Sequence, residues 1–299
     1  MKILLFGRNG QVGWELQRAL APLGELVALD RRGRDGLCGN LSDLAGLRRT
    51  VAEVRPQVVV NAAAYTAVDQ AESEPELATM INAEAPGVLA EATKEQNALL
   101  VHYSTDYVFD GRGERPWQED DSAAPQNVYG RTKWEGERAM REANPNHLIL
   151  RTQWVYAARG RNFLATMLRL AGEREQLQVV DDQFGAPTGA ELIADVTAHA
   201  VRETLAKPGL AGTYHLAASG VTSWHGYARF LIEAAREAGQ PVRVADEAIL
   251  PVGSDAFATP AKRPHNSRLS LDRIESAFGL RMPDWREGVA RTIKELLHA

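Results

Sequence analysis

The sequence MKILLFGRNGQVG, residues 1–13, decides the fold of this chain. Residues 2–6 form an apolar run that is typical of a strand buried on both faces of a parallel sheet. Leucines at 16, 20 and 23 follow at helical spacing. Gly7, Gly10 and Gly13 therefore occupy a strand-to-helix turn, where the missing side chains let a pyrophosphate approach the backbone at the helix N-terminus. The stretch predicts a dinucleotide-binding site.

A second strand is expected at residues 25–29, and it ends at Asp30, about twenty residues past the glycine turn. A carboxylate there can accept hydrogen bonds from both ribose hydroxyls of an adenosine, which favours NAD(H). Arg31, Arg32 and Arg34 follow at once, and guanidinium groups beside the ribose can accommodate a 2′-phosphate. We therefore expect both NADH and NADPH to be accepted. The other interpretation, a glycine turn beside a solvated charge cluster, leaves the order of strand, turn, helix, strand and acid unexplained.

Composition bounds the class of protein. The 299 residues carry a formal charge of -5 and a sequence pI near 5.9, which gives no electrostatic reason to expect nucleic acid or an anionic membrane as a partner. Cys38 has no second cysteine with which to form an internal disulfide. The chain opens on a strand pattern and contains no apolar run of membrane-spanning length. We expect a cytoplasmic protein.

Strand and helix patterns alternate through the first half of the chain, which predicts an α/β fold built on a doubly wound parallel sheet. The elements expected there are helices at 44–54 and 77–89 and strands at 58–61, 98–103 and 148–151.

Beyond residue 156 the alternation loosens. The elements expected there are helices at 163–171, 189–205, 224–234 and from about 285, with strands at 177–180 and 214–217. We expect a dinucleotide-binding domain over residues 1–155, to which some later segments return, and a smaller, mainly substrate-binding α/β domain over 156–299.

Candidate catalytic residues gather around one sheet edge. The strand expected at 98–103 leads into Thr105, at the edge where ligands bind in such folds. Tyr129 and Lys133 stand four residues apart on an expected helix and so share one face. A neighbouring ammonium favours the phenolate, and the Thr105 hydroxyl can bind the same carbonyl oxygen. A tyrosine and a lysine at this spacing are common on solvated helices, but beside the glycine turn they predict reduction of a carbonyl group.

Six segments carry a resemblance to a known family: FGRNGQVGWEL (6–16), VNAAA (60–64), HYSTDYVF (102–109), VYGRTK (128–133), GAPTGAE (185–191) and RPHNSRL (263–269). With them, and with its Gly-x-x-Gly-x-x-Gly spacing, essentially the whole chain resembles the extended short-chain dehydrogenase/reductases, which have a Rossmann fold. Within that family it is most similar to enzymes that reduce dTDP-4-dehydro-β-L-rhamnose with NAD(P)H. The resemblance implies the last step of dTDP-rhamnose biosynthesis, for lipopolysaccharide O-antigen.

The resemblance also implies roles for individual residues. Tyr129 is then the proton donor, Lys133 binds the nicotinamide ribose and tunes the tyrosine, and Thr105 helps to match the pKa of site and substrate. Where Tyr65 stands, a histidine is familiar in the family, so the cofactor contact there rests on backbone. The implied cofactor contacts are Gly7, Gly10, Gln11, Val12, Gly13, Asp30, Asn40, Leu41, Ala64, Tyr65, Thr66, Tyr129 and Lys133, and the implied substrate contacts are Thr105, Asp106 and Trp154.

The sequence gives weaker evidence on whether the protein binds a metal ion. Some relatives dimerise around Mg²⁺ through acids that match Glu15 and Glu191. Two carboxylates are more often solvated or salt-bridged, so we assign no metal and keep Mg²⁺ at a dimer interface as an alternative.

We expect a homodimer that binds a sugar nucleotide. Arg263 and Arg268 can contact its diphosphate or form salt bridges in a C-terminal loop, and His102 is expected to pack within the fold.

Two rival functions stay open. A sugar-nucleotide dehydratase or epimerase shares the fold, but dehydratases resembling this chain carry Asp-Glu after the strand-end threonine, whereas here Tyr107 follows Asp106. A non-catalytic NADP-binding regulatory subunit, similar to the β subunit of methionine adenosyltransferase, keeps a comparable pocket. Intact Thr105, Tyr129 and Lys133 favour an enzyme, and turnover decides between the two.

Overall fold

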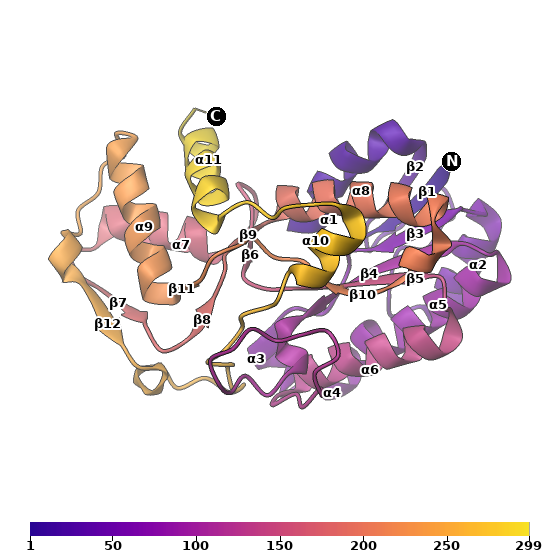
Figure 1. Cartoon of the computed structure of the whole chain (residues 1–299), viewed down its shortest axis with the longest axis horizontal. Helices are drawn as coiled ribbons and strands as arrows, with labels where there is room; N and C mark the ends of the chain where they lie inside the picture. The colour runs from indigo at the N-terminus through magenta and orange to yellow at the C-terminus, as the bar shows by residue number, and fades with distance from the viewer. Residues whose placement is uncertain (299) are drawn as a thin grey trace.

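The computed structural model describes residues 1–298, with side chains described to residue 296, and its larger part is built on a six-stranded parallel sheet (Figure 1). The strand order is β10-β5-β4-β3-β1-β2. The bounds are β1 Lys2–Phe6, β2 Glu25–Leu29, β3 Val58–Asn61, β4 Leu99–Thr105, β5 His147–Thr152 and β10 Gly212–His215. The chain passes from β1 to β2 on one side and returns to β3 on the other, so the crevice between β1 and β3 is a topological switch point. The sheet confirms the predicted α/β fold.

Helices cover both faces of this sheet (Figure 1). One layer holds α1 (Gln11–Leu20) and α8 (Ala190–Ala206), and the other holds α2 (Leu44–Val54), α5 (Ala85–Glu95) and α6 (Val128–Ala143). Successive strand residues face opposite layers, because Ile3 packs in the core with Leu16 whereas Leu4 packs with Leu47. The apolar run after Met1 is therefore buried on both sides, as its sequence predicts.

A second core lies at the other end of the molecule (Figure 1). The helices there are α7 (Phe163–Glu173), α9 (Trp224–Glu237) and α11 (Trp285–His298), beside the parallel pair β7 (Leu177–Val180) and β12 (Ile249–Val252). Two short ladders, β6 (Val155–Tyr156) with β9 (Thr188–Gly189) and β8 (Phe184–Gly185) with β11 (Thr222–Ser223), complete this part. Three segments after residue 156, namely α8, β10 and α10 (Asp272–Phe278), pack with the larger sheet.

Two expected elements differ from the structure for identifiable reasons. The strand expected at 214–217 is β10, Gly212–His215, because its register is set by pairing with β5. The helix expected at 77–89 is divided into α4 (Pro75–Thr79), a π-helical turn (Met80–Glu84) and α5. Pro86 has no N–H with which to continue the α-helical ladder to Asn82. A short helix, α3 (Val68–Ala71), precedes α4.

Among the described residues no helix combines the length and the apolar character needed to cross a bilayer.

Candidate active site

The glycine turn brings three segments into close contact at the switch point. Gly7 has a φ of +86°, and a Cβ there would lie 2.7 Å from the backbone nitrogen of Ala63. A Cβ at Gly13 would lie 2.0 Å from the Gly7 carbonyl oxygen, so α1 reaches the turn only because this side chain is missing. Gly10 caps α1 without a side-chain hydrogen bond, which leaves backbone N–H groups of its first turn to bind an anion. The turn therefore fits a dinucleotide pyrophosphate.

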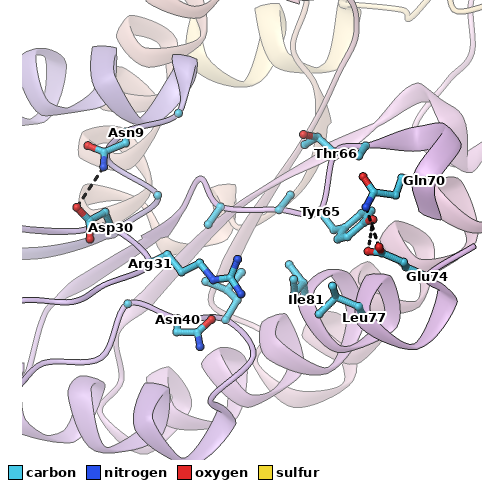
Figure 2. Close-up of a pocket in the computed structure, with 17 residues that line it drawn as sticks. Asn9, Asp30, Arg31, Asn40, Tyr65, Thr66, Gln70, Glu74, Leu77 and Ile81 are labelled. Carbon is cyan, nitrogen blue, oxygen red and sulfur yellow. Dashed lines mark hydrogen bonds between the residues drawn. The ribbon is translucent and has the colours of Figure 1, made fainter. Parts of the chain in front are cut away.

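A cavity of about 540 Å³ opens beside this turn (Figure 2). Eight of the expected cofactor contacts line it: Gly7, Gly10, Asp30, Asn40, Leu41, Ala64, Tyr65 and Thr66. Gln11, Val12, Gly13, Tyr129 and Lys133 are not among its lining residues. Gln11 instead accepts a hydrogen bond from Asn162, at 2.8 Å from its Oε1 to Asn162 Nδ2.

Asp30 is held as a carboxylate at the cavity wall. It accepts a hydrogen bond from Asn9 Nδ2 at 3.1 Å (Figure 2). It also accepts from the backbone N–H of Arg32 at 2.9 Å and pairs with Arg8 at 3.4 Å. The Arg32 N–H is the largest cause of the lowered pKa of Asp30. Sequence reasoning missed Arg8 and Asn9, although both lie inside the quoted glycine turn.

Tyr65 is positioned from the helical segment that follows it. Its hydroxyl donates to Glu74 Oε2 at 2.7 Å (Figure 2). Asn82 Oδ1 accepts from the Tyr65 N–H at 2.9 Å, and Asn82 Nδ2 donates to the Tyr65 carbonyl at 3.0 Å. Asn82 belongs to the π-helical turn. The local departure from α-helix thus fixes the backbone of a cavity-lining segment, which the sequence pattern did not reveal.

The expected catalytic residues come together between β4 and α6. Thr105 is the last residue of β4, and Tyr129 lies in the first turn of α6, which begins at the cap residue Asn127. Thr105 Oγ1 accepts from the Tyr107 N–H at 3.2 Å and donates to Asp106 Oδ1 at 3.1 Å. Burial raises the pKa of Tyr129 to about 12, against an opposing hydrogen bond with Thr105. The structure thus presents a protonated phenol beside a threonine hydroxyl.

The Lys133 amine contacts two neighbouring residues of β4. Its Nζ donates to the Tyr103 carbonyl at 2.6 Å and lies 2.9 Å from His102 Nε2. Burial lowers the pKa of Lys133 to about 7. We expected the Lys133 ammonium to favour the Tyr129 phenolate. In the structure burial is the largest influence on the pKa of Tyr129 and raises it, and the roles of Lys133 toward Tyr129 and the ribose stay predictions.

Asp106 and Trp154 are the other expected substrate contacts, and each has an unusual environment or conformation. Burial raises the pKa of Asp106 to about 6. Trp154 follows β5 in the left-handed region, with a φ of +45°, and its ring stacks on Trp224. Trp224 lines a second cavity of about 520 Å³, together with Phe163, Gln183, Lys262, Arg263 and His265 among others. Trp154 itself is not among the lining residues of that cavity.

The basic residues of the C-terminal loop have separate environments. Arg263 lines the second cavity and pairs with Asp69 at 2.6 Å. Arg268 lies 4.7 Å from the ring centroid of Phe184 and does not line the cavity. Arg263 is therefore the better placed of the two to meet a ligand.

Glu15 and Glu191 are both salt-bridged, to Arg18 at 3.4 Å and to Arg291 at 2.9 Å. Within residues 1–298 as described, no three His, Cys, Asp or Glu side chains are grouped so as to hold a metal ion. The two acids thus have the ion pairs that their sequence context also allowed.

Comparisons with known proteins agree on one family. A family model described as RmlD substrate binding domain matches residues 1–298. The chain is 56% identical to dTDP-4-dehydrorhamnose reductase of Escherichia coli K12, over 99% of this chain and 98% of that protein, and 50% identical to the protein of the same name in Burkholderia thailandensis, over 99% of each. Among solved structures, dTDP-4-dehydrorhamnose reductase of Bacillus anthracis in complex with NADP is similar, with a TM-score of 0.87, 34% identity and 98% of each chain covered.

Proposed function

The chain belongs to the RmlD substrate binding domain family, and from that premise we propose that it reduces the C4 keto group of dTDP-4-dehydro-β-L-rhamnose to give dTDP-β-L-rhamnose. The observation that carries the proposal is the protonated Tyr129 hydroxyl beside Thr105 at the carboxyl end of β4. The glycine turn that fits a dinucleotide follows β1 in the same sheet, so both sites open at one edge. The curated relatives that carry the reductase name support the substrate.

NADPH or NADH supplies a hydride to C4 of the sugar when it is bound. The backbone at Gly7 and Gly10 is suited to the pyrophosphate, and Asp30 with Arg31 and Arg32 to the adenosine ribose. The NADP complex of the Bacillus anthracis protein supports this cofactor class.

Tyr129 then acts as the general acid. As C4 gains the hydride, the carbonyl π bond breaks, O4 takes the proton from Tyr129 Oη, and a phenolate is left on the enzyme. With substrate bound, the Thr105 hydroxyl turns from Asp106 Oδ1 and donates its hydrogen bond to the same oxygen while negative charge develops there. Asp106 and Trp154 bind and orient the sugar. The Tyr129 phenol is protonated near neutral pH, so it meets the keto group in the form that can donate.

The remaining expectations belong to the same proposal. We assign the larger sheet, with α8, β10 and α10, to cofactor binding, and the second core to sugar-nucleotide binding. We also propose a cytoplasmic homodimer that supplies dTDP-rhamnose for O-antigen synthesis. These assignments rest on the resemblance, and light scattering of the purified protein tests the dimer.

The test of the reaction is NADPH oxidation, followed by absorbance, with the dTDP-4-dehydro-6-deoxy-sugar generated in situ. We expect oxidation only when the 3,5-epimerase is also present, with dTDP-L-rhamnose as the product. Oxidation without the epimerase would point to a different keto-sugar. NADPH binding without any oxidation would overturn the proposal and favour the regulatory-subunit function.

A further inference from the structure

The side chain of Asn127 joins the start of α6, the helix that carries Tyr129, to the loop at residues 261–263. Asn127 caps α6, because its Oδ1 accepts a hydrogen bond from the Gly130 N–H at 2.7 Å. Its Nδ2 donates to the Lys262 carbonyl at 2.8 Å. Asn127 is buried, and the two contacts use both ends of its amide. One side chain therefore holds together two segments that lie 135 residues apart in the sequence.

The first turn of α6 is packed tightly against its neighbours. A Cβ at Gly130 would lie 2.2 Å from the Tyr107 carbonyl oxygen, so the turn lies directly on the segment that follows β4. The Val128 N–H donates to Glu72 Oε1 at 2.8 Å. Tyr129 is the second residue of this turn. The position of its hydroxyl thus depends on the contacts that hold the start of α6.

The loop at residues 261–263 belongs to the wall of the second cavity, which Lys262 and Arg263 line. Asp69 of α3 holds the loop from the other side, because it pairs with Arg263 at 2.6 Å and accepts from the Ala261 N–H at 3.2 Å. Arg263 Nη1 is buried and has no hydrogen-bond partner within the described part of the chain. A guanidinium group with an unused donor, beside an ammonium group, suits the diphosphate of a nucleotide.

We propose that Asn127 is a positioning residue that connects the second cavity with Tyr129. Contact of a nucleoside diphosphate with Lys262 and Arg263 fixes the loop, and the Lys262 carbonyl then fixes Asn127 and the first turn of α6. The Tyr129 hydroxyl is thereby held in place for proton donation when the sugar nucleotide is bound. This inference rests on the proposed reduction. Asn127 acts through Tyr129 and takes no part in the proton transfer itself.

The cap and the connection can be separated by substitution. Serine and aspartate cap helices about as well as asparagine does, and here Asp43 caps α2 and Ser223 caps α9. Neither type reproduces the bond to the Lys262 carbonyl, because an ionised aspartate has no donor and a serine side chain ends one bond earlier. Asn127→Ser and Asn127→Asp therefore keep the cap and remove the connection.

The first experiment measures turnover of these two variants. We expect kcat to fall about tenfold or more in both, because a small misplacement of a reacting group can lower the rate by about 10²-fold. KM for NADPH should stay within about twofold of the wild type, and an unchanged Tm shows that the cap is kept. Asp43→Ser, the matched exchange of a cap at α2, should leave kcat unchanged. Near-normal kcat in both Asn127 variants would overturn the proposal.

The second experiment needs no turnover. The seven tyrosines are labelled with ¹³C at Cζ, and Tyr129→Phe assigns the Tyr129 signal in NMR spectra. The probe is dTDP, which carries the nucleoside diphosphate without the sugar. We expect saturating dTDP to shift the Tyr129 signal in the wild type and to leave it unshifted in Asn127→Ser, in which calorimetry still detects dTDP binding.

Three outcomes of this second experiment would contradict the proposal. An equal shift in both proteins would show that the effect of dTDP does not pass through Asn127. The absence of a shift in the wild type would show that the second cavity and Tyr129 are not connected. Loss of dTDP binding in Asn127→Ser would make Asn127 a part of the nucleotide site.

The two proposals fail separately. A dTDP-dependent shift that Asn127→Ser abolishes, in a protein that shows no turnover, keeps the connection and rejects the reductase. Normal turnover in both Asn127 variants keeps the reductase and rejects the connection.

Discussion

Trp154 stacks on Trp224 with ring centroids 3.7 Å apart and ring planes 16° from parallel. Trp154 has a positive φ, a conformation that a bulky residue keeps only when its surroundings hold it. Trp224 begins α9 and is fixed by its own hydrogen bond, from Nε1 to Gln183 Oε1 at 3.1 Å. The stack therefore connects the loop after β5 with the second core, beside the second cavity that Trp224 lines.

Replacing Trp224 should weaken substrate binding without affecting the cofactor. An aromatic pair contributes roughly 0.5–1.5 kcal/mol beyond its buried area, so Trp224→Leu should raise KM for the sugar nucleotide about three- to tenfold. Steady-state kinetics and NADPH titration measure the two effects. Trp224→Phe keeps an aromatic plane and should lie near the wild type. If Trp224→Leu lost NADPH affinity to the same degree, Trp224 would not act only on sugar-nucleotide binding through its stack with Trp154.

Tyr129→Phe removes only the proton donor. The phenyl ring can keep the edge contact with Tyr107, whose ring centroid lies 5.5 Å from that of Tyr129. General acid catalysis contributes typically about 10²- to 10⁴-fold, so kcat should fall by this factor while NADPH affinity changes by less than about twofold. Tyr214→Phe is the matched control, because the Tyr214 hydroxyl donates to the Leu210 carbonyl in another part of the sheet. Near-normal turnover in Tyr129→Phe would refute the assigned mechanism.

Glu137→Gln should destabilise the fold. Glu137 and Arg151 are almost fully buried, and Arg151 donates through Nε at 2.9 Å and through Nη2 at 2.7 Å. Breaking a buried pair leaves a charge without its partner, so the free energy of unfolding should fall by about 3–5 kcal/mol. Chemical denaturation measures it. Glu142→Gln, at an exposed ion pair of the same helix, should cost less than about 1 kcal/mol.

The pH dependence of this contribution has a defined sign. Burial alone would raise the pKa of Glu137, but Arg151 holds it below its ordinary value of 4.5. The stabilisation is therefore fully present above pH 4.5 and is lost as pH falls through the pKa of the folded state. A wild-type advantage over Glu137→Gln that grew on acidification would contradict the ion pair.

The sequence predicted those features that depend on local patterns. Apolar runs identified the strands β1 to β5, and the spacing of Tyr129 and Lys133 predicted that the two share one helix face. The pattern could not predict the contact of His102 with Lys133, because it joins residues from β4 and α6 that only the fold brings together. Asn82 was missed for a similar reason, since its role follows from the turn that Pro86 imposes. Spacing also could not predict the lowered pKa of Lys133, because burial causes that shift and cannot be inferred from spacing.

His215 should make the fold sensitive to acid. It lies fully buried on β10, and burial, followed by the charge of Arg151, lowers its pKa to about 3. Between pH 6.5 and 3 the unfolded chain binds a proton that the folded chain does not, so stability falls as pH falls, by up to about 1.4 kcal/mol per pH unit. Asp106 acts oppositely, because its raised pKa makes the folded chain the better proton binder between pH 3.8 and 6.

The measurement is therefore a difference between two proteins. His215→Gln should lose less stability than the wild type between pH 7 and pH 5, by roughly 2 kcal/mol. Denaturation curves at the two pH values provide the comparison. Equal losses in both proteins would mean that His215 does not bind its proton on unfolding.

Replacing Asp30 should change the preference between NADH and NADPH. Its carboxylate accepts from Arg32 N–H and Asn9 and pairs with Arg8, and it is the group suited to the free ribose hydroxyls of NADH. Asp30→Ala removes the hydrogen-bond acceptor for the ribose, so KM for NADH should rise at least about tenfold. KM for NADPH should stay the same or fall, because Arg8 and Arg32 lose a competing anion and can meet a 2′-phosphate. Asp35→Ala, at an exposed ion pair with Arg34 in the same loop, should change neither value. An equal rise in KM for NADH and for NADPH would mean that Asp30 maintains the conformation of the loop and does not distinguish the two riboses.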